Sequence, residues 1–262
     1  MAQGMLQGKT GIVTGGGSGI GRAIAVALAQ AGAAVCVADL DAGRARAVAD
    51  EIGRAGGRAH PVTADVSKAP TVRVAVDETV RAFGGLEILV NNAGLQHVCS
   101  IAEYPEDKWD LLVGVMLTGT FLCTKYALPH MIRKKWGRVV NIASAHGLVA
   151  SPFKSAYVAA KHGIVGFTKV AALELGEHGI TVNAICPGYV RTPLVEGQLP
   201  DLARTHRMSE ADVLEKIILA PVAIKRLIEP DEIASMAIFL CTDAAAAISG
   251  TTHTIDGGWT AR

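Results

Sequence analysis

A tyrosine and a lysine near the middle of the chain are spaced so that they could perform acid–base chemistry. Lys161 follows Tyr157 by four residues, which places both side chains on one face of a helix. A phenol has a pKa of about 10, so a tyrosine base at neutral pH needs its anion stabilised by about 4 kcal/mol. An ammonium about 4 Å away supplies a similar amount at an effective dielectric of about 20. The pair predicts that Tyr157 exchanges a proton with an alcohol or ketone, supported by Lys161.

A serine upstream completes this set. Ser144 ends an apolar run, and its hydroxyl could hydrogen-bond the oxygen of the reacting substrate. An isolated Tyr-x-x-x-Lys pattern is more often a surface pair on a helix, so the catalytic interpretation depends on the nucleotide motif described next. We predict Ser144, Tyr157 and Lys161 as the catalytic residues, with Ser144 and Tyr157 also contacting the substrate.

A second lysine precedes the tyrosine by three residues and lies on the same predicted helix face. A cation beside a reacting centre favours an anionic substrate, which charge and hydrogen bonds could hold. Each polar side chain near it could also be an ordinary loop or surface residue, and the tryptophan could serve only in packing. The predicted contacts of a small carboxylate and its apolar end are Gln96, His146, Lys154, Gln198 and Trp259.

A glycine-rich turn, "TGGGSGIGRA" at 14–23, follows the first apolar run. Glycines allow backbone N–H groups to approach a pyrophosphate at the positive end of a helix. The spacing differs from GxGxxG, so the strand–turn–helix setting carries the prediction of a nucleotide site. The contacts expected from this turn are Gly15, Gly17, Ser18, Gly19, Ile20 and Gly21.

An aspartate ends the second apolar run, 18 residues after Gly21. The Asp39 carboxylate could accept hydrogen bonds from the adenosine ribose and repel a 2′-phosphate, which favours NAD over NADP. Its alternative role is to cap the next helix, and the two roles are compatible. Later strand ends add further predicted cofactor contacts, which are Asp65, Val66, Asn92, Ala93 and Gly94.

Apolar runs that alternate with amphipathic stretches supply the elements that position these residues. The predicted strands are 10–15, 33–39, 58–65, 86–94, 137–144, 180–188 and 252–258, and the predicted helices are 18–31, 42–55, 67–83, 105–135, 153–178 and 230–241. We expect Ser67 to cap one helix and Pro105 and Pro230 to begin two others. Repeated βα alternation predicts one domain over 1–262, with a doubly wound (Rossmann) seven-stranded parallel sheet and helices on both faces.

One connection is unusually long for such a fold. Residues 188–229 separate the last two strands and contain a helical stretch near 209–219, where Ser209 and Asp212 are spaced as in a capping box. We predict a substrate lid at 188–229.

Composition narrows the class of protein. Lys and Arg number 25 against 24 Asp and Glu, which argues against nucleic acid or an anionic membrane as partner. No apolar run approaches the roughly 18 residues of a membrane span, and the first residues lack a signal-peptide core. The five cysteines are scattered, which indicates a reducing, cytoplasmic location. No metal site is predicted.

The motifs together resemble the short-chain dehydrogenase/reductase family along essentially the whole chain. "TGGGSGIG", "NNAG", Ser144, Tyr157-x-x-x-Lys161 and Pro187-Gly188 occur in family order and spacing. The resemblance implies hydride transfer to or from a nicotinamide cofactor, with acid–base chemistry by the serine, tyrosine and lysine. It also implies cofactor contacts by Tyr157, Lys161, Pro187, Gly188, Val190 and Thr192.

Four segments are similar to a narrower family, the bacterial D-3-hydroxybutyrate dehydrogenases. They are "NNAGLQHV", "HGLVASPFKSAYVAAKHGIVG", "ITVNAICPGYVRTPLVEGQ" and "DGGWTAR". That family interconverts (R)-3-hydroxybutyrate and acetoacetate with NAD and is usually tetrameric. The resemblance implies that Gln96, His146, Lys154 and Gln198 hold the substrate carboxylate.

One position departs from the wider family. Its members commonly carry an asparagine in the helix before the fifth strand, where this chain has Met116 within "VMLTGTF". A thioether cannot donate a hydrogen bond, so the side chain cannot replace asparagine in a proton relay. We predict an interrupted helix at 114–120, in which the Met116 carbonyl lacks a helical partner and holds a relay water.

Two other functions fit parts of the sequence. A reductase of 3-oxoacyl thioesters would be expected to use NADP and present a basic surface, which Asp39 and the neutral charge balance oppose. A non-catalytic NAD-binding protein would explain Met116, but the intact Ser144, Tyr157 and Lys161 argue against it.

Overall fold

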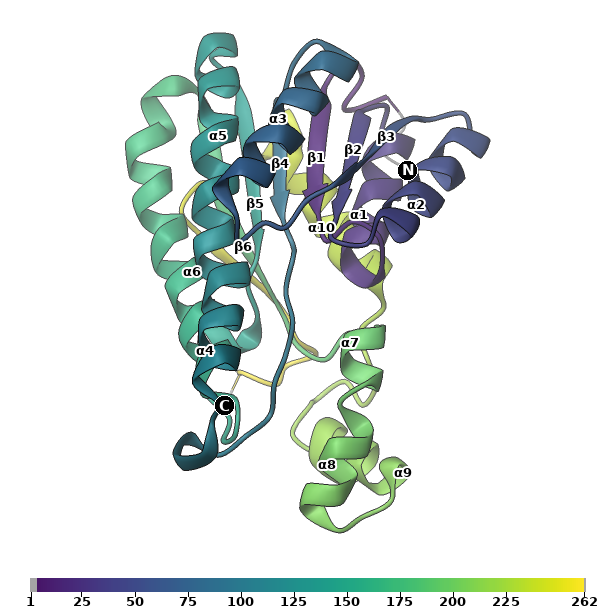
Figure 1. Cartoon of the computed structure of the whole chain (residues 1–262), viewed down its shortest axis with the longest axis vertical. Helices are drawn as coiled ribbons and strands as arrows, with labels where there is room; N and C mark the ends of the chain where they lie inside the picture. Colours follow the sequence, from purple (N-terminus) through teal and green to yellow (C-terminus); the bar gives the residue numbers. More distant parts are fainter. Residues whose placement is uncertain (1–3, 262) are drawn as a thin grey trace.

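Seven parallel strands form one sheet in the order β3-β2-β1-β4-β5-β6-β7 (Figure 1). The computed structural model describes residues 4–261. The strands are β1 Thr10–Thr14, β2 Ala34–Asp39, β3 Arg58–Thr63, β4 Ile88–Asn91, β5 Gly137–Ile142, β6 Ile180–Pro187 and β7 Thr252–Ile255. All seven predicted strands are present, with shorter carboxyl ends than predicted for six of them. The residues after those ends form the loops of the site.

Helices cover both faces of the sheet, as the doubly wound prediction requires. The main helices are α1 Gly19–Gln30, α2 Ala42–Arg54, α3 Ala69–Phe83, α4 Glu106–Val113, α5 Gly119–Lys134, α6 Ser155–Leu175 and α10 Pro230–Cys241. α1 packs against α10 and α2, while α3 packs against α5 and α4 against α6. The central strands are fully buried because apolar side chains on both faces meet these two helix layers.

The helix predicted over 105–135 is interrupted at the expected place. α4 ends at Val113, a π-helical turn covers Gly114–Thr118, and α5 then continues from Gly119. The chain packs closely directly after this turn, since a Cβ on Gly119 would lie 2.9 Å from a Val66 methyl group. The predicted interruption of this helix is confirmed by the π-helical turn.

Two helix starts differ from the prediction. α3 begins after Lys68 rather than at Ser67, whose N–H and hydroxyl both bond the Asp65 carboxylate. Asp39 does not cap α2, because Asp41 does so by accepting hydrogen bonds from the Gly43 and Arg44 N–H groups. In both places a short polar side chain bonds a nearby turn instead of the helix end. Asp39 remains available for another role.

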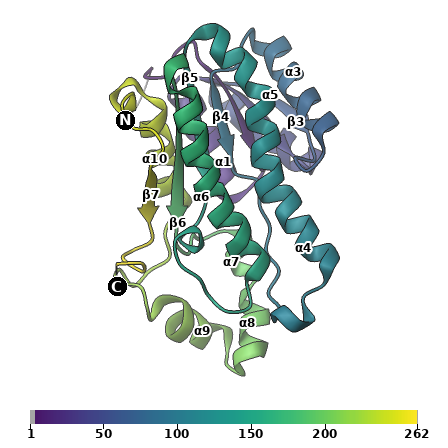
Figure 2. The ribbon, with the colours of Figure 1, turned by 90° about the vertical axis from the view of Figure 1, so that its left-hand side faces the viewer.

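The long connection folds into a small helical lobe beyond the sheet edge (Figures 1 and 2). It contains α7 Pro193–Glu196, α8 Leu199–His206, α9 Glu210–Val213 and a π-helical turn at Leu214–Leu219. Of these elements, only the helical stretch near 209–219, with Ser209 as its cap, was predicted. The lobe has its own apolar cluster of Leu202, Val213, Ile218 and Leu227, which stabilises helices too short to form alone.

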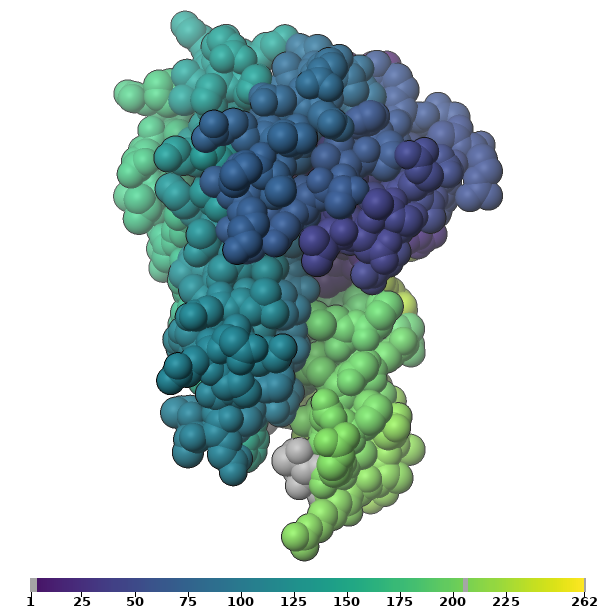
Figure 3. Space-filling view, in the orientation of Figure 1, coloured from purple at the N-terminus to yellow at the C-terminus, as the bar shows by residue number. Residues whose placement is uncertain are grey.

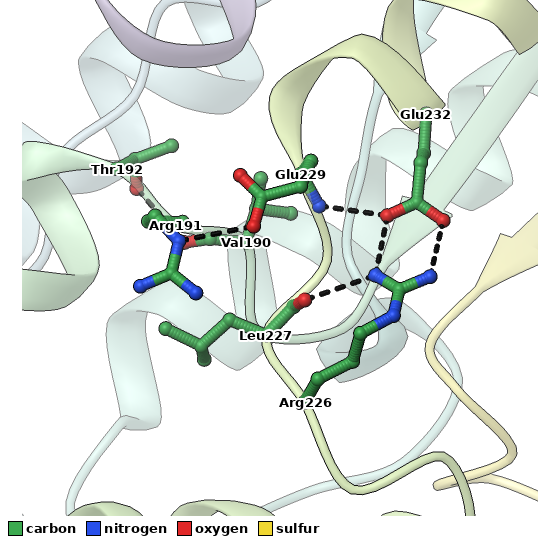
Figure 4. Close-up of polar contacts among 7 residues, drawn as sticks. All are labelled: Val190, Arg191, Thr192, Arg226, Leu227, Glu229 and Glu232. Atoms are coloured by element: carbon green, nitrogen blue, oxygen red, sulfur yellow. Dashed lines mark hydrogen bonds and ion pairs between the residues drawn. The ribbon is translucent and has the colours of Figure 1, made fainter.

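The two ends of this lobe are tied together at its stem (Figure 4). Val190 pairs with Ile228 in a parallel bridge, and Arg191 bonds Glu229 at 3.0 Å. Arg226 contacts both carboxylate oxygens of Glu232 at 2.6 and 2.8 Å. These contacts join the first and last residues of the lobe to each other and to the start of α10.

By length and composition alone, one helical stretch of the described chain, Glu106–Lys134, could cross a membrane. This stretch is the interrupted α4–α5 helix, and the sequence analysis found no uninterrupted apolar run of that length. Its buried apolar side chains belong to the clusters beside the sheet, and they are Leu112, Met116, Cys123, Ala127 and Met131. A core helix has this composition.

Candidate active site

The carboxyl ends of the parallel strands bring the predicted residues to one edge of the sheet. In Figure 2, β6 and β7 point toward the lobe that contains α7–α9. The space-filling view shows a gap between this lobe and the segment that contains α4 (Figure 3). Ligands of open α/β sheets bind outside the carboxyl ends of the strands, so this edge is the candidate active site.

The glycine-rich turn after β1 has a backbone that side chains would disrupt. Gly15 and Gly19 have φ of +60° and +52°, and a Cβ on Gly21 would lie 2.1 Å from the Gly15 carbonyl oxygen. Asn92, after β4, donates to the Thr14 and Gly15 carbonyls at 3.0 and 3.1 Å. The turn is thus held open at the start of α1, where its N–H groups could meet a pyrophosphate.

Asp39 lies at the end of β2, beside this turn. One carboxylate oxygen accepts from the Gly17 N–H at 2.9 Å, and the other accepts from the Asp41 N–H at 3.0 Å. Each oxygen can still accept another hydrogen bond, and no ion pair of the described residues includes Asp39. The fixed carboxylate could receive two ribose hydroxyls, and its charge opposes a phosphate there.

Two further predicted cofactor contacts, Asp65 and Thr192, follow other strands of the sheet. The Asp65 carboxylate is committed to Ser67, which leaves the neighbouring backbone to face an adenine. Thr192 caps α7, and a Cβ on Gly19 would lie 3.2 Å from its methyl group. The turn after β1 and the segment after β6 therefore meet across one site.

The three predicted catalytic residues lie together. Ser144 and Tyr157 line the same cavity, and the Lys161 Nζ lies 5.5 Å from the centre of the Tyr157 ring. Burial raises the pKa of Tyr157, and the hydrogen bond to Ser144 opposes that rise. Burial lowers the pKa of Lys161 to about 8. Its ammonium donates to the Ile142 carbonyl at 2.6 Å, which fixes it at the end of β5.

A cavity of about 50 Å³ adjoins this trio. All seven residues predicted to contact the substrate line it, which are Gln96, Ser144, His146, Lys154, Tyr157, Gln198 and Trp259. They come from the loops after β4, β5 and β7, from the start of α6, and from the lobe. The sequence predicted one site from spacing and resemblance, and the fold arranges these residues around one cavity.

Lys154 differs from the helical position predicted for it, because α6 begins at Ser155 and Lys154 is the preceding N-cap residue. Its side chain is only 5% exposed. No ion pair among the side chains that the structure describes includes it, and burial lowers its pKa to about 8. Near neutral pH the cavity wall therefore carries a buried positive charge without an anionic partner.

His146 and the two glutamines provide neutral hydrogen-bonding groups. Burial and the nearby Lys154 lower the pKa of His146 to about 3, and its Nε2 lies 2.9 Å from the Ser151 hydroxyl. Gln96 accepts from the His97 N–H through its Oε1, which leaves its amide N–H₂ as a potential donor. Gln198 instead donates to the Leu194 carbonyl at 2.8 Å. That amide must rotate or move before it can donate to a ligand.

The cavity has an aromatic wall that the sequence analysis identified only in part. The centre of the Trp259 ring lies 4.9 Å from the centre of the His146 ring and 5.9 Å from that of Tyr189. Tyr189, Leu194 and Val195 also line the cavity and were not predicted. Their position directly after Pro187-Gly188 and at the start of the lobe was the available signal.

Met116 is fully buried beside this site, and its side chain reaches the Gly94 turn. Its carbonyl does not lack a partner as predicted, since it accepts from the Thr120 hydroxyl at 2.7 Å and from the Gly119 N–H. The correction has a simple cause, because a threonine four residues on can bond back to a carbonyl that the π turn frees. The predicted relay water would have to share or displace this hydroxyl.

The family described as short chain dehydrogenase matches residues 9–203. The D-beta-hydroxybutyrate dehydrogenase of Rhizobium meliloti is 49% identical over 97% of this chain and 99% of its own length. The protein of the same name from Cupriavidus necator is 46% identical over 98% of this chain and 100% of its own. A relative from Sphingobium indicum, 42% identical over 98% of each chain, is a 2,5-dichloro-2,5-cyclohexadiene-1,4-diol dehydrogenase.

Proposed function

The chain belongs to the short chain dehydrogenase family, and we propose that it interconverts (R)-3-hydroxybutyrate and acetoacetate with NAD. The observation that carries the proposal is the buried, unpaired Lys154 in a small cavity beside Ser144 and Tyr157. A buried ammonium is costly unless an anion compensates it, and a small 3-hydroxy acid offers a carboxylate at one end and a reacting hydroxyl near the other. One relative of 42% identity is named for a chlorinated diol, so sequence identity alone does not determine the substrate.

The residues present fit a nicotinamide cofactor. The open glycine turn, whose Gly21 leaves no space for a Cβ, offers backbone N–H groups for the pyrophosphate. Asp39 would hold the ribose, and the resemblance adds the segment from Pro187 to Thr192. When bound, the cofactor would accept or donate the hydride at the alcohol carbon. The Asp39 charge favours NAD over NADP.

The chain's own residues account for the proton. In the oxidation direction Tyr157 takes the hydroxyl proton, and Ser144 donates a hydrogen bond that keeps the substrate oxygen in place. Lys161, fixed by the Ile142 carbonyl, places a positive charge near the phenolate. Lys154, with hydrogen bonds from Gln96 and His146, holds the carboxylate at the other end of the cavity. Trp259 closes the side that would receive the methyl group.

The proposal also includes the oligomeric state, the cellular location and the domain organisation of the enzyme. Resemblance to the hydroxybutyrate dehydrogenases favours a homotetramer. The described cysteines are all free, which agrees with a reducing, cytoplasmic location. We propose one catalytic domain in which residues 188–229 act as the substrate lid.

NADH formation measured with (R)-3-hydroxybutyrate tests the function. We expect turnover with this acid, at least tenfold higher kcat/KM with NAD than with NADP, and little turnover of the S enantiomer. A preference for a 3-oxoacyl thioester and NADPH would instead identify a thioester reductase. Binding of NAD without any turnover would identify a non-catalytic nucleotide-binding protein.

A further inference from the structure

Tyr189 holds a position that neither the sequence motifs nor the comparisons explain. Its hydroxyl lies 3.4 Å from the Lys154 Nζ, which is 5.2 Å from the centre of the same ring. Within the described chain, this hydroxyl is the only hydrogen-bond partner of the Lys154 side chain. The 3.4 Å separation is at the long end of the range for a hydrogen bond.

The chemistry of this partner suits a site that must remain positive. A carboxylate beside Lys154 would pair with the ammonium and cancel the charge that attracts an anionic substrate. A phenol offers an acceptor without a charge, and burial keeps Tyr189 neutral by raising its pKa to about 12. His146 is neutral as well, since its pKa falls to about 3. The ammonium has three donors, so a bond to Tyr189 leaves two for a carboxylate.

Backbone and ring contacts anchor Tyr189 at the stem of the lobe. Its carbonyl accepts from the Ile228 N–H at 3.0 Å, directly beside the bridge between Val190 and Ile228. The centre of its ring lies 5.9 Å from that of Trp259, and its side chain packs against the apolar cluster of the lobe. A residue anchored in this way can hold a flexible lysine side chain in one place.

We propose that Tyr189 is a positioning residue, whose neutral hydroxyl holds the Lys154 ammonium toward the cavity and thereby selects for a carboxylate substrate. The inference rests on the proposed function only for the identity of the substrate. The contact between Tyr189 and Lys154 can be tested without turnover.

The kinetic test compares Tyr189→Phe with the wild-type enzyme on two substrates, (R)-3-hydroxybutyrate and its neutral amide, (R)-3-hydroxybutyramide. Loss of one hydrogen bond should raise KM for the acid by about three- to tenfold, with kcat and the KM for NAD within twofold. KM for the amide should stay within twofold. An equal rise for acid and amide would mean that Tyr189 only packs, and no rise for either would overturn the proposal.

The chain offers a matched control. The Tyr126 hydroxyl also accepts a hydrogen bond from a cation, since Arg73 donates to it at 3.2 Å, but this pair lies outside the site. Tyr126→Phe should leave both substrates unchanged. A Tyr126→Phe effect equal to that of Tyr189→Phe would attribute the result to general destabilisation and overturn the inference.

A binding-independent measurement separates this inference from the proposed function. The Lys154 ammonium can be titrated by NMR in protein labelled with ¹³C-lysine, with Lys154→Arg used to assign its signal. Removing an acceptor from the charged form lowers a lysine pKa, so Tyr189→Phe should move the Lys154 midpoint to lower pH. An unchanged midpoint would overturn the inference even in an active enzyme. A shifted midpoint in a protein that does not oxidise the acid would leave the contact intact and reject the proposed substrate.

Discussion

The two ends of the site are prepared for their ligands in opposite ways. At the nucleotide end, the polar groups that shape the turn are bonded within the protein, as with Asn92 on the glycine turn and Asp39 on Gly17. At the substrate end, Lys154 is buried without a counter-charge, and the buried Oε1 of Gln198 has no partner among the described residues. The first end offers a rigid shape, whereas the second offers uncompensated charge.

This difference indicates that nucleotide recognition and substrate discrimination depend on different features of the site. Backbone shape recognises the pyrophosphate that all nucleotides of this class share. A buried charge discriminates among small substrates, because a neutral ligand leaves the ammonium uncompensated. Substitutions at the nucleotide end should therefore act through shape, and those at the substrate end should act through charge.

The largest effect is expected where the two ends meet. Tyr157→Phe removes the group that exchanges the proton but keeps the ring, so kcat should fall by about a thousandfold. NAD and acetoacetate should still bind with affinities within about threefold of wild type. Stopped-flow turnover and calorimetric binding would check this prediction. Substantial residual turnover would assign the proton to another group.

At the nucleotide end, a substitution that alters the backbone shape should weaken NAD binding. A methyl group on Gly21 would overlap the Gly15 carbonyl, so Gly21→Ala should destabilise the fold by about 2–3 kcal/mol and weaken NAD binding by about 30- to 100-fold. Gly53→Ala in α2 is the control, because nothing lies within 4 Å of its Cβ position. That variant should be slightly more stable and bind NAD normally. Equal NAD affinity in all three proteins would show that the turn does not hold the nucleotide.

At the substrate end, the preference for the acid over its amide should decrease as the pH rises. Burial lowers the pKa of Lys154 to about 8, so the cation is present below that pH and lost above it. The ratio of kcat/KM for (R)-3-hydroxybutyrate to that for its amide should fall by up to about tenfold per pH unit above 8. Lys161 titrates in the same range but acts on both substrates, so the ratio cancels its effect. A ratio that stays constant to pH 10 would contradict the role of Lys154.

The smallest effect is expected between the two ends, at the π turn. Met116 packs its side chain in the core, and its carbonyl already has protein donors. Met116→Asn should therefore change kcat by less than about tenfold, equivalent to 1.4 kcal/mol. Steady-state kinetics at saturating substrate would measure it. A gain beyond tenfold would show that the methionine had impaired the proton relay.

The sequence predicted the sheet far better than the lobe. Strands such as Ala34–Asp39 are apolar on both faces, so their position follows from short buried runs alone. By contrast α7 and α8 are short and depend on the apolar cluster around Leu202. Contacts between distant segments, rather than local propensity, decide whether such helices form.

The site shows the same division. Residues at strand ends, such as Ser144 and Asp39, were predicted because parallel strands share one carboxyl edge. Tyr189 was missed because nothing in "CPGYV" indicates that its hydroxyl meets a lysine 35 residues earlier. The partner of the Met116 carbonyl was missed because a π turn shifts which groups remain free.

The central claim is that Lys154 selects a carboxylate substrate, and one measurement tests it most directly. It is the ratio of kcat/KM for (R)-3-hydroxybutyrate to that for (R)-3-hydroxybutyramide, in wild type and in Lys154→Met, which keeps the packing but removes the charge. Removing one partner of a buried charge pair costs about 2–5 kcal/mol, so the ratio should fall by about 30-fold or more while the KM for NAD stays unchanged. A ratio that is the same in both proteins would contradict the account.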